Sequence, residues 1–343
     1  MKLCEFDVGK DVDITAHRMR TLTLLLAGLM AAGVSMPGMA STLPAPQQDQ
    51  RPVFRSSAAR VTLAVTVRDR RGRPVTDLTR ADFSLLDRGQ PRVIQDFSRD
   101  AAPVGIALLA DVSGSMDVAE KKAATRQIAS QLVASLRAGE DQVGLFAFDR
   151  GLEEIQALGP APGTVIADLD KILPYGRTSL FDAIADTGRR LAANAGPRRA
   201  VVVLTDGYDN ASRMTPEEVS AFASSIDVPV YVIVVHSPFD RAGSHSLIQP
   251  SLEELRDGPL GNLARWTGGD ILMPVTPAEL VTTMVQFVSE LRHQYLMAFE
   301  PGREPGWHAL ELRTRRSDLI VRARSGYLVP GTPGAISSTG LTR

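Results

Sequence analysis

Five side chains that carry oxygen ligands lie where apolar runs end or where helices are expected to begin. Two are carboxylates and three are hydroxyls: Asp111, Ser113, Ser115, Thr178 and Asp206. The first three fall within one short turn, where Gly114 lets the backbone fold tightly. Carboxylate and hydroxyl oxygens are hard ligands, which suit Mg²⁺, Mn²⁺ or Ca²⁺ rather than Zn²⁺. We therefore predict a divalent-cation site with one coordination position left open.

Each of these residues also has an ordinary structural interpretation. A serine after Asp111 can cap the next helix, Thr178 can cap another, and Asp206 belongs to a common turn sequence. Taken together, the residues favour a metal site, because helix caps do not require both acids and all three hydroxyls. Asp182 and Asp209 lie close by in sequence and are secondary candidates for orienting the ligands. Charge at a helix start explains Asp182 equally well.

The elements that position these residues follow from the alternation of apolar runs and helical patterns. Strands are expected at Val104–Ala110, Val143–Phe148, Leu152–Leu158, Ala200–Leu204, Val228–Val235 and Ile271–Met273. Helices are expected at Met116–Leu136, Leu180–Ala193, Pro216–Ser225, Leu260–Thr267 and Pro277–Leu291. This order predicts an α/β fold, with a doubly wound, mostly parallel sheet covered on both faces. Ligands bind at the carboxyl ends of the strands in such sheets, where Asp111 and Asp206 fall.

Short strands joined by tight turns flank the α/β part on both sides. They are expected at Val61–Val67, Phe83–Leu86 and Val93–Phe97, and again at Tyr295–Phe299, Trp307–Leu312 and Leu319–Arg324. Neither half has enough strands for a stable sheet alone, so we expect both to form one small antiparallel β-sandwich. The expected organisation is a signal peptide at 1–40, a linker at 41–57, sandwich segments at 58–100 and 293–329, the α/β domain at 103–292 and a disordered tail at 330–343.

The N-terminal region has the pattern of an export signal. Arg18 and Arg20 precede an apolar run, Leu22–Val34, and small residues around Ala40 supply a cleavage site. The run is too short and too glycine-rich for a membrane span. We therefore expect no stable span after cleavage, and an uncleaved anchor is the alternative. The acidic, polar stretch before the run makes Met19 a candidate start of the chain.

Composition limits the location and the partners. The chain of 343 residues has 38 Lys and Arg against 39 Asp and Glu, so its net charge of -1 gives no indication of a nucleic-acid partner. Its single cysteine, Cys4, precedes the predicted cleavage site. Export without disulfides is typical of a bacterial periplasmic or secreted protein with a core of sufficient size.

The five oxygen-bearing residues also carry a family resemblance. As a set, they resemble the metal-ion-dependent adhesion site of von Willebrand factor A domains, over roughly Pro103–Leu291. The resemblance implies that the three hydroxyls bind the metal and that the two carboxylates bind it directly or through water. It also implies that the open position takes an Asp or Glu side chain from a protein partner. The flanking segments, Val67–Val75 and Arg322–Tyr327, resemble those of a group of exported bacterial proteins with this domain.

Three classes of function fit such a site. The favoured one is an exported module that binds an acidic residue of a partner through the cation and is not an enzyme. The second is a Mg²⁺-dependent phosphatase with Asp111 as nucleophile. That chemistry normally uses a second acid two residues on, where this chain has Ser113, and no lysine is obviously placed to clamp a phosphoryl group. The third is a structural envelope protein whose metal only stabilises the fold.

Overall fold

The structure is a computed structural model that describes residues 60–160, 162–193, 198–215, 218–219, 222, 228–236 and 252–329. The predicted signal peptide (1–40), the predicted linker (41–57) and the predicted tail (330–343) lie outside these residues, as do the first two residues of the predicted sandwich segment, 58–59. Most of the helix predicted at Pro216–Ser225 lies outside them as well. No helix in the described ranges is long and apolar enough to cross a membrane.

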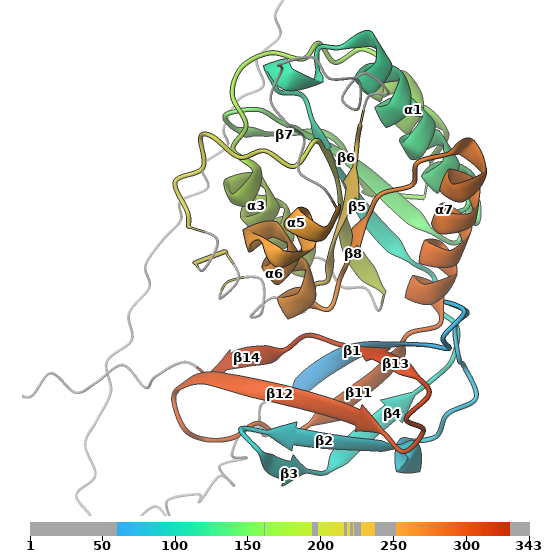
Figure 1. The fold of residues 1–343 in the computed structure, drawn as a ribbon, viewed down its shortest axis with the longest axis vertical. Coiled ribbons are helices and arrows are strands. Elements are labelled where there is room, and N and C mark those ends of the chain that lie inside the picture. Colours follow the sequence, from blue (N-terminus) through green and yellow to red (C-terminus); the bar gives the residue numbers. More distant parts are fainter. Residues whose placement is uncertain are drawn as a thin grey trace, which may run out of the picture. The chain divides into compact units, whose positions relative to one another are not determined.

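A six-stranded sheet forms the centre of the α/β part, in the order β10-β9-β8-β5-β6-β7 (Figure 1). The strands are β5 (Gly105–Asp111), β6 (Gln142–Phe148), β7 (Leu152–Gly159), β8 (Arg199–Thr205), β9 (Val230–Val234) and β10 (Ile271–Leu272). All neighbours pair in parallel except β7, which runs antiparallel to β6 at one edge. The predicted mostly parallel sheet is thereby confirmed.

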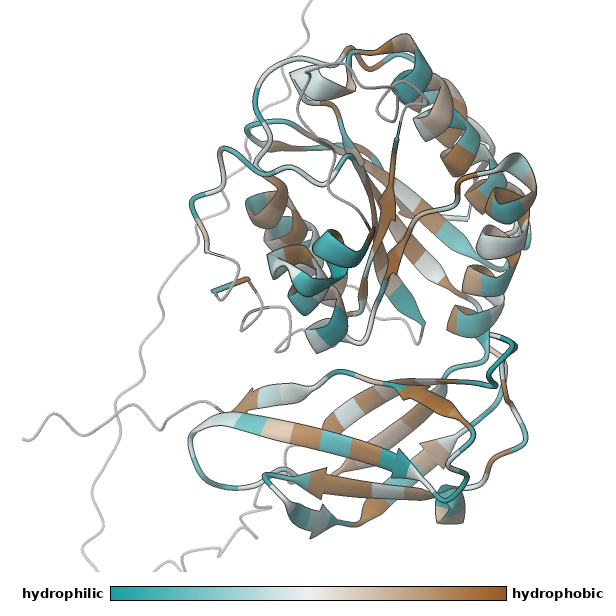
Figure 2. Cartoon of the chain, in the orientation of Figure 1, coloured by the Kyte–Doolittle hydropathy of each residue, from teal (hydrophilic) through white to brown (hydrophobic). Residues whose placement is uncertain are grey.

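Helices cover both faces of this sheet, because alternate residues of each strand point to opposite sides. On β5, Ile106 and Leu108 pack in one apolar cluster, whereas Ala107 and Leu109 pack in another. The first cluster lies under α1 (Ala119–Ala134), α2 (Val165–Leu169) and α7 (Pro277–Arg292). The second lies under α3 (Leu180–Ala193), α5 (Leu252–Asp257) and α6 (Pro259–Thr267). Figure 2 shows the corresponding pattern, with hydrophobic residues along the central strands and hydrophilic ones on the outer faces of the helices.

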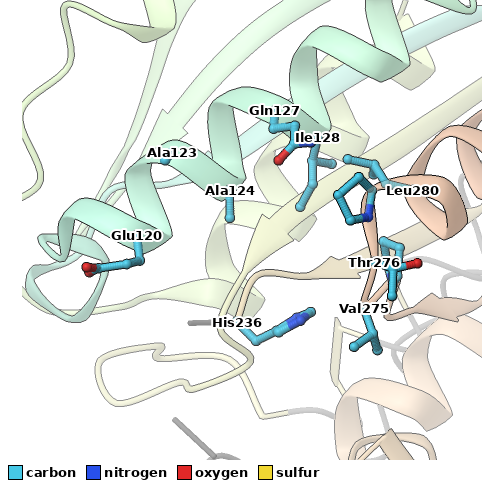
Figure 3. A pocket seen from close by; sticks show the side chains of 11 residues that line it. Glu120, Ala123, Ala124, Gln127, Ile128, His236, Val275, Thr276 and Leu280 are labelled. Carbon is cyan, nitrogen blue, oxygen red and sulfur yellow. The ribbon is translucent and has the colours of Figure 1, made fainter. Parts of the chain in front are cut away.

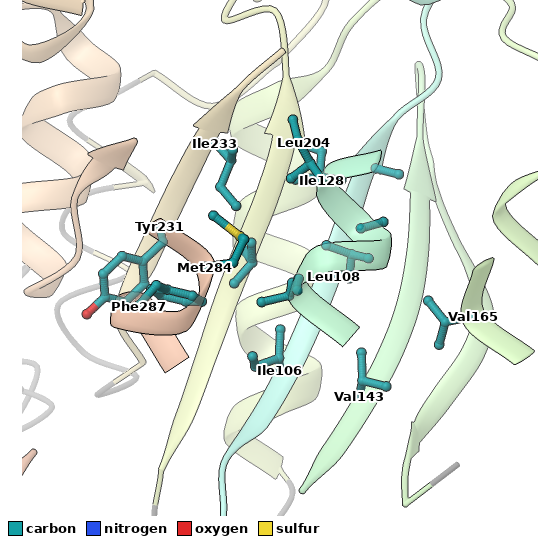
Figure 4. Packing of buried hydrophobic residues seen from close by; sticks show 14 of the residues in the cluster. Ile106, Leu108, Ile128, Val143, Val165, Leu204, Tyr231, Ile233, Met284 and Phe287 are labelled. Carbon is teal, nitrogen blue, oxygen red and sulfur yellow. The ribbon is translucent and has the colours of Figure 1, made fainter. Parts of the chain in front are cut away.

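Packing in the first cluster holds α7 against the sheet (Figure 4). The ring of Phe287 on α7 meets the ring of Tyr231 on β9 edge-on, with centroids 4.7 Å apart. Met284, one turn earlier on α7, is fully buried beside them. The helix begins with a capping box, in which the Thr276 side chain accepts from the backbone N–H of Glu279 at 3.2 Å and the Glu279 carboxylate reciprocates.

The flanking strands form two four-stranded sheets, each built from both ends of the described chain. One has the order β13-β1-β11-β4 and the other β14-β12-β2-β3. The strands are β1 (Val61–Arg68), β2 (Phe83–Asp87), β3 (Gln90–Arg92), β4 (Ile94–Ser98), β11 (Tyr295–Phe299), β12 (Gly306–Thr314), β13 (Ile320–Arg322) and β14 (Gly326–Val329). Because β1 pairs with β11 and β13, and β2 pairs with β12, the predicted antiparallel sandwich from two segments is confirmed.

A polar cluster around the buried Asp87 carboxylate links β2, β3, β12 and β14 of the sandwich. The Asp87 carboxylate lies 2.7 Å from His308 Nδ1 and accepts a hydrogen bond of 2.9 Å from the Tyr327 hydroxyl. Arg92 completes the set with an ion pair of 3.0 Å to the same carboxylate. Burial alone would raise the pKa of Asp87, but the hydrogen bonds from His308 and Tyr327 hold it below its usual range.

Ion pairs also connect α7 with the sandwich strands. The Glu290 carboxylate, 2% exposed, contacts the guanidinium of Arg68 on β1 and lies 3.5 Å from that of Arg322 on β13. Arg322 reaches Asp270 at 2.5 Å as well. Burial raises the pKa of Glu290 in spite of the two arginines. The pairs compensate for taking these charges out of water.

Candidate metal centre

The first loop of the centre follows β5 directly. Asp111 ends that strand, and only 2% of its surface is exposed. Its Oδ1 accepts a hydrogen bond of 2.9 Å from the backbone N–H of Ser113, which folds the loop back toward the carboxylate. The Ser113 and Ser115 hydroxyl oxygens lie 3.1 Å apart. Ser113 is buried and Ser115 is exposed, so the hydroxyl pair extends from the interior to the surface.

The second loop, which carries Thr178, is fixed to the first by backbone contacts. Gly176 accepts a hydrogen bond of 3.0 Å from Gly114 N, and Tyr175 N donates to Val112 O at 2.7 Å. Gly176 has a φ of +92°, and a Cβ atom there would lie 2.9 Å from an Asp149 carboxylate oxygen. A larger residue is therefore disfavoured both by the backbone conformation and by this close approach.

The third loop follows β8 and carries Asp206, which is fully buried. It is joined to the first loop by Thr205, whose hydroxyl donates to Asp111 Oδ2 at 2.6 Å. It is joined to the second by Asn210, whose side-chain oxygen accepts from Thr178 N at 3.0 Å. The three loops thus hold one another in a closed set of contacts at the carboxyl ends of β5 and β8.

The two secondary candidates stabilise these loops through backbone contacts. Asp209 Oδ1 accepts from the backbone N–H of Leu180, the first residue of α3, at 2.8 Å. Asp182 accepts from the backbone N–H groups of Arg213 and Met214, both at 2.9 Å. Both carboxylates therefore orient the loops that carry Thr178 and Asp206, and both Asp182 oxygens and Asp209 Oδ1 accept from backbone donors.

The electrostatics of the centre are dominated by burial. Burial raises the pKa of the Asp111 carboxyl to about 6, although hydrogen bonds from Ser113 and Thr205 favour the charged form. The neighbouring charge of Asp206 adds to the rise. A cation between the two carboxylates would offset both the burial and their mutual repulsion.

The oxygen set fits a hard divalent cation. Asp206 Oδ1 is buried and has no hydrogen-bond partner, which is uncommon for a carboxylate oxygen inside a protein. The set has only two carboxylates, and no group of three or more His, Cys, Asp or Glu side chains suited to a metal exists in the described ranges. Any metal here would therefore depend on the hydroxyls of Ser113, Ser115 and Thr178, a donor type suited to Mg²⁺ or Mn²⁺ rather than Zn²⁺.

A lysine that the sequence analysis did not single out contacts this centre. The Lys121 ammonium, on the first turn of α1, donates to Asp206 Oδ2 at 2.9 Å. Thr205 and Asn210, which join the loops, were also missed. The available signal for Lys121 was helical spacing, because it lies seven residues before Ile128 on the buried face of α1.

Neither of two pockets near the centre is lined by all five residues. A pocket of about 400 Å³ lies between α1 and the start of α7, where Ala124 and Ile128 lie across from Val275 and Leu280 (Figure 3). None of the five predicted ligands lines it. A second pocket, of about 220 Å³, reaches Asp111 from the α1 side. Of the five residues, only Ser115 is exposed, and Asp111, Ser113, Thr178 and Asp206 are buried beneath it.

Large apolar side chains are exposed on the same loops. Leu173 and Tyr175, just before Gly176, are 81% and 80% exposed. Val118, three residues after Ser115, is 39% exposed. These three side chains place apolar groups beside the polar centre on two of its loops.

One protein family matches the part of the chain that carries the three loops. Residues 106–208 match the family model of the von Willebrand factor type A domain. No curated protein matches the sequence.

Several solved structures are similar to the chain. The conserved hypothetical protein BatB from Bacteroides thetaiotaomicron is 18% identical over 55% of this chain and 98% of its own, with a TM-score of 0.43. A von Willebrand factor type A protein from Catenulispora acidiphila is 13% identical over 79% of this chain and 73% of its own, with a TM-score of 0.45. The manganese-loaded TRAP protein of Plasmodium vivax is 14% identical over 73% of this chain and 100% of its own, with a TM-score of 0.41.

Proposed function

We propose, from the von Willebrand factor type A domain that residues 106–208 form, that this protein is an exported module that binds a protein partner through a divalent cation. Asp111, Ser113, Ser115, Thr178 and Asp206 would hold the cation, with Mg²⁺ favoured and Mn²⁺ or Ca²⁺ as alternatives. The bound cation would supply an electrophilic position for an Asp or Glu side chain of the partner. The role of the chain is to hold the ligands and orient them, with Ser115 as the ligand that reaches the surface.

The buried, unpartnered oxygen of Asp206 is the observation that carries this proposal. Three loops from separate parts of the sequence are hydrogen-bonded to one another and bring hard oxygens to the same strand ends. Within that set, Asp206 Oδ1 lacks a donor. A buried carboxylate oxygen left without a donor costs stability, and a metal ion is one of the partners that compensates for the loss.

The exposed groups around the centre support binding of a protein. Tyr175 and Leu173 lie on the loop that reaches Thr178, and their exposure gives an apolar border to the polar site. A partner segment that carries an acidic residue between apolar ones matches both features. Contacts of this kind place the charged group at the metal and exclude water around it.

The phosphatase alternative is less well supported. Both oxygens of Asp111 already accept hydrogen bonds, from Ser113 N and from Thr205 Oγ1, and the residue is almost fully buried. A nucleophile needs a free oxygen aimed at the substrate. Lys121 lies close to the site, but its ammonium is paired with Asp206. Only 10% of its side chain is exposed, so it is poorly placed to contact a phosphoryl group. We propose that the protein is not an enzyme, and phosphatase and esterase assays of the full chain should be blank.

Metal binding is tested first with the ion alone. Isothermal titration of the full chain with Mg²⁺ and Mn²⁺ should show one site, and Asp206→Asn should abolish it, because a main share of the charge that holds the cation is removed. Glu153→Gln, an exposed carboxylate on β7, is the matched control and should bind as the parent does. Equal affinity in the parent and in Asp206→Asn would refute the assignment of the site.

Partner binding is tested next with envelope proteins of the source cell. The immobilised chain should retain a partner in Mg²⁺ and release it in chelator, and Asp206→Asn should retain none in either condition. A partner that is retained equally by the parent and by Asp206→Asn would exclude recognition through the metal. Metal binding without metal-dependent retention would favour the alternative in which the cation only stabilises the fold.

A further inference from the structure

Lys121 brings a positive charge to a residue of the candidate metal centre. It lies on the first turn of α1, and its ammonium donates a hydrogen bond of 2.9 Å to Asp206 Oδ2. Only 10% of the Lys121 side chain and none of the Asp206 side chain is exposed. Lysine is almost never buried to this extent unless its charge is paired. The contact with Asp206 therefore determines where the ammonium lies.

The position of Lys121 on the inner face follows from the helix itself. The buried residues of α1 repeat at intervals of three and four: Lys121, Thr125, Ile128, Ala129 and Leu132. Residues at this spacing share one face of a helix. Since the C-terminal members of this face pack on the sheet, its first member is directed toward the strand ends where the loops meet.

The neighbouring basic residues of α1 do not share this role. Lys122 pairs with Asp117, and both side chains are about half exposed. Arg126 pairs with Asp170, and these side chains are also largely exposed. Lys121 is thus set apart from the basic outer surface of α1 by its burial and by its partner.

We propose that Lys121 competes with the divalent cation for Asp206 and so lowers the affinity of the centre for metal. The inference rests on the proposed metal-binding function. Without metal, the ammonium neutralises Asp206 and offsets its repulsion of Asp111. A cation bound at the free Oδ1 of Asp206 meets the ammonium across the same carboxylate, where like charges repel in a buried site. Metal binding is opposed by this repulsion or requires the lysine side chain to withdraw from Oδ2.

The competition predicts opposite effects on two measurable quantities. Removing the ammonium should lower the stability of the metal-free chain, because Asp206 is then left as a buried charge without a partner. The same change should raise the metal affinity, because the repulsion is gone. A lysine with a purely structural role would change the first quantity and leave the second unaltered or lower it.

The experiment uses the full chain and Mn²⁺ alone, with free Mn²⁺ measured by electron paramagnetic resonance. Lys121→Met should lower the Kd for Mn²⁺ by about tenfold or more, given the strength of charge repulsion at such distances. Lys122→Met, the adjacent exposed lysine, is the matched control and should stay within about twofold of the parent. Lys121→Arg keeps the charge and should also stay close to the parent. Lys121→Gln provides a second neutral variant if the Met variant folds poorly, and circular dichroism in chelator verifies the fold of each.

The outcomes separate the inference from the function on which it rests. Tighter Mn²⁺ binding by the neutral variants than by the parent supports the competition. Equal affinity in the parent and the neutral variants overturns the inference and leaves the metal site in place. Weaker binding overturns it too, since Lys121 would then be a support for Asp206. No binding by the parent or by any neutral variant would remove the proposed metal-binding function and the inference together.

Discussion

Replacing Asp111 with asparagine is expected to stabilise the metal-free protein at neutral pH, although it removes a predicted ligand. Burial raises the pKa of this carboxyl to about 6, so the ionised form is disfavoured in the folded chain. Asparagine has nearly the same shape and no charge. Its side-chain oxygen can accept from Ser113 N, as Asp111 does, and its amide group can donate to the Thr205 hydroxyl oxygen, which reverses the direction of that contact.

The size of the effect follows from the rise in pKa. The ordinary value is 3.8 and the folded value about 6, and a difference of about 2 corresponds to about 3 kcal/mol. Because the pKa is raised on folding, the folded chain holds the proton more tightly than the unfolded one. The resulting stabilisation is fully present below pH 3.8 and is lost as the pH rises through about 6. Asp111→Asn avoids that loss, so its advantage grows as the pH rises through this window and is complete above it.

Thermal melts in chelator measure this advantage. At about 2–4 °C per kcal/mol for a domain of this size, the melting temperature should rise by about 5–10 °C at pH 7.5 and change little near pH 4. The exposed Asp77→Asn is the control and should match the parent at both pH values. The reasoning would be refuted if Asp111→Asn melts no higher than the parent at pH 7.5. It would also be refuted if the melting temperature rises by the same margin at both pH values. Added Mg²⁺ should then stabilise the parent and not the variant.

Three further predictions concern the sandwich and its ion pairs with α7. Glu290→Ala leaves buried arginine charge without a partner, so it should lower the urea-derived free energy of unfolding by about 3 kcal/mol. The control Glu311→Ala, at an exposed position, should change this free energy by less than about 0.5 kcal/mol. Similar losses in both variants would contradict the role of the buried pair. Asp87→Ala removes the carboxylate beside His308, so it should lower the free energy of unfolding by about 3 kcal/mol. Proteolysis of the sandwich should become faster, and an unchanged cleavage rate would contradict this prediction. Residues 58–100 alone should give the NMR spectrum of an unfolded chain, because their main strand partners come from the C-terminal segment; a dispersed spectrum would disprove this dependence.

Much of the fold was predictable from the sequence because parallel strands are buried on both faces. Such strands appear as continuous apolar runs, and helices on either side show regular spacing. The helix at Leu180–Ala193 was predicted with the bounds that the structure has. The elements that were missed are short: α2, α5, β3 and β14 have between three and six residues. Periodicity over so few residues does not distinguish an element from a loop.

The helix predicted at Met116–Leu136 shows a second kind of limit. In the structure α1 begins at Ala119, because Gly114–Met116 form a separate 3-10 turn. In that turn Ser115 lies at the surface. A helix starting at Met116 would instead have made Ser115 the N-cap residue. The difference arises from the contact between Gly114 and Gly176, which are far apart in sequence. Local propensity does not carry information about such a contact.

The five predicted ligands lie on neighbouring loops in the structure, but Lys121 was not among the predicted site residues. Lysine on an amphipathic helix is ordinarily on the solvent face, and Asp206 lies 85 residues away. Extending the buried face of Ile128 and Leu132 toward the N-terminus reaches Thr125 and then Lys121. A lysine at the start of the inner face of α1, the helix that follows β5, points to the strand ends. A buried lysine there requires an acidic side chain to pair with its charge. Read in this way, the helical spacing of α1 predicts a carboxylate partner within the site, and Asp206 is that partner in the structure.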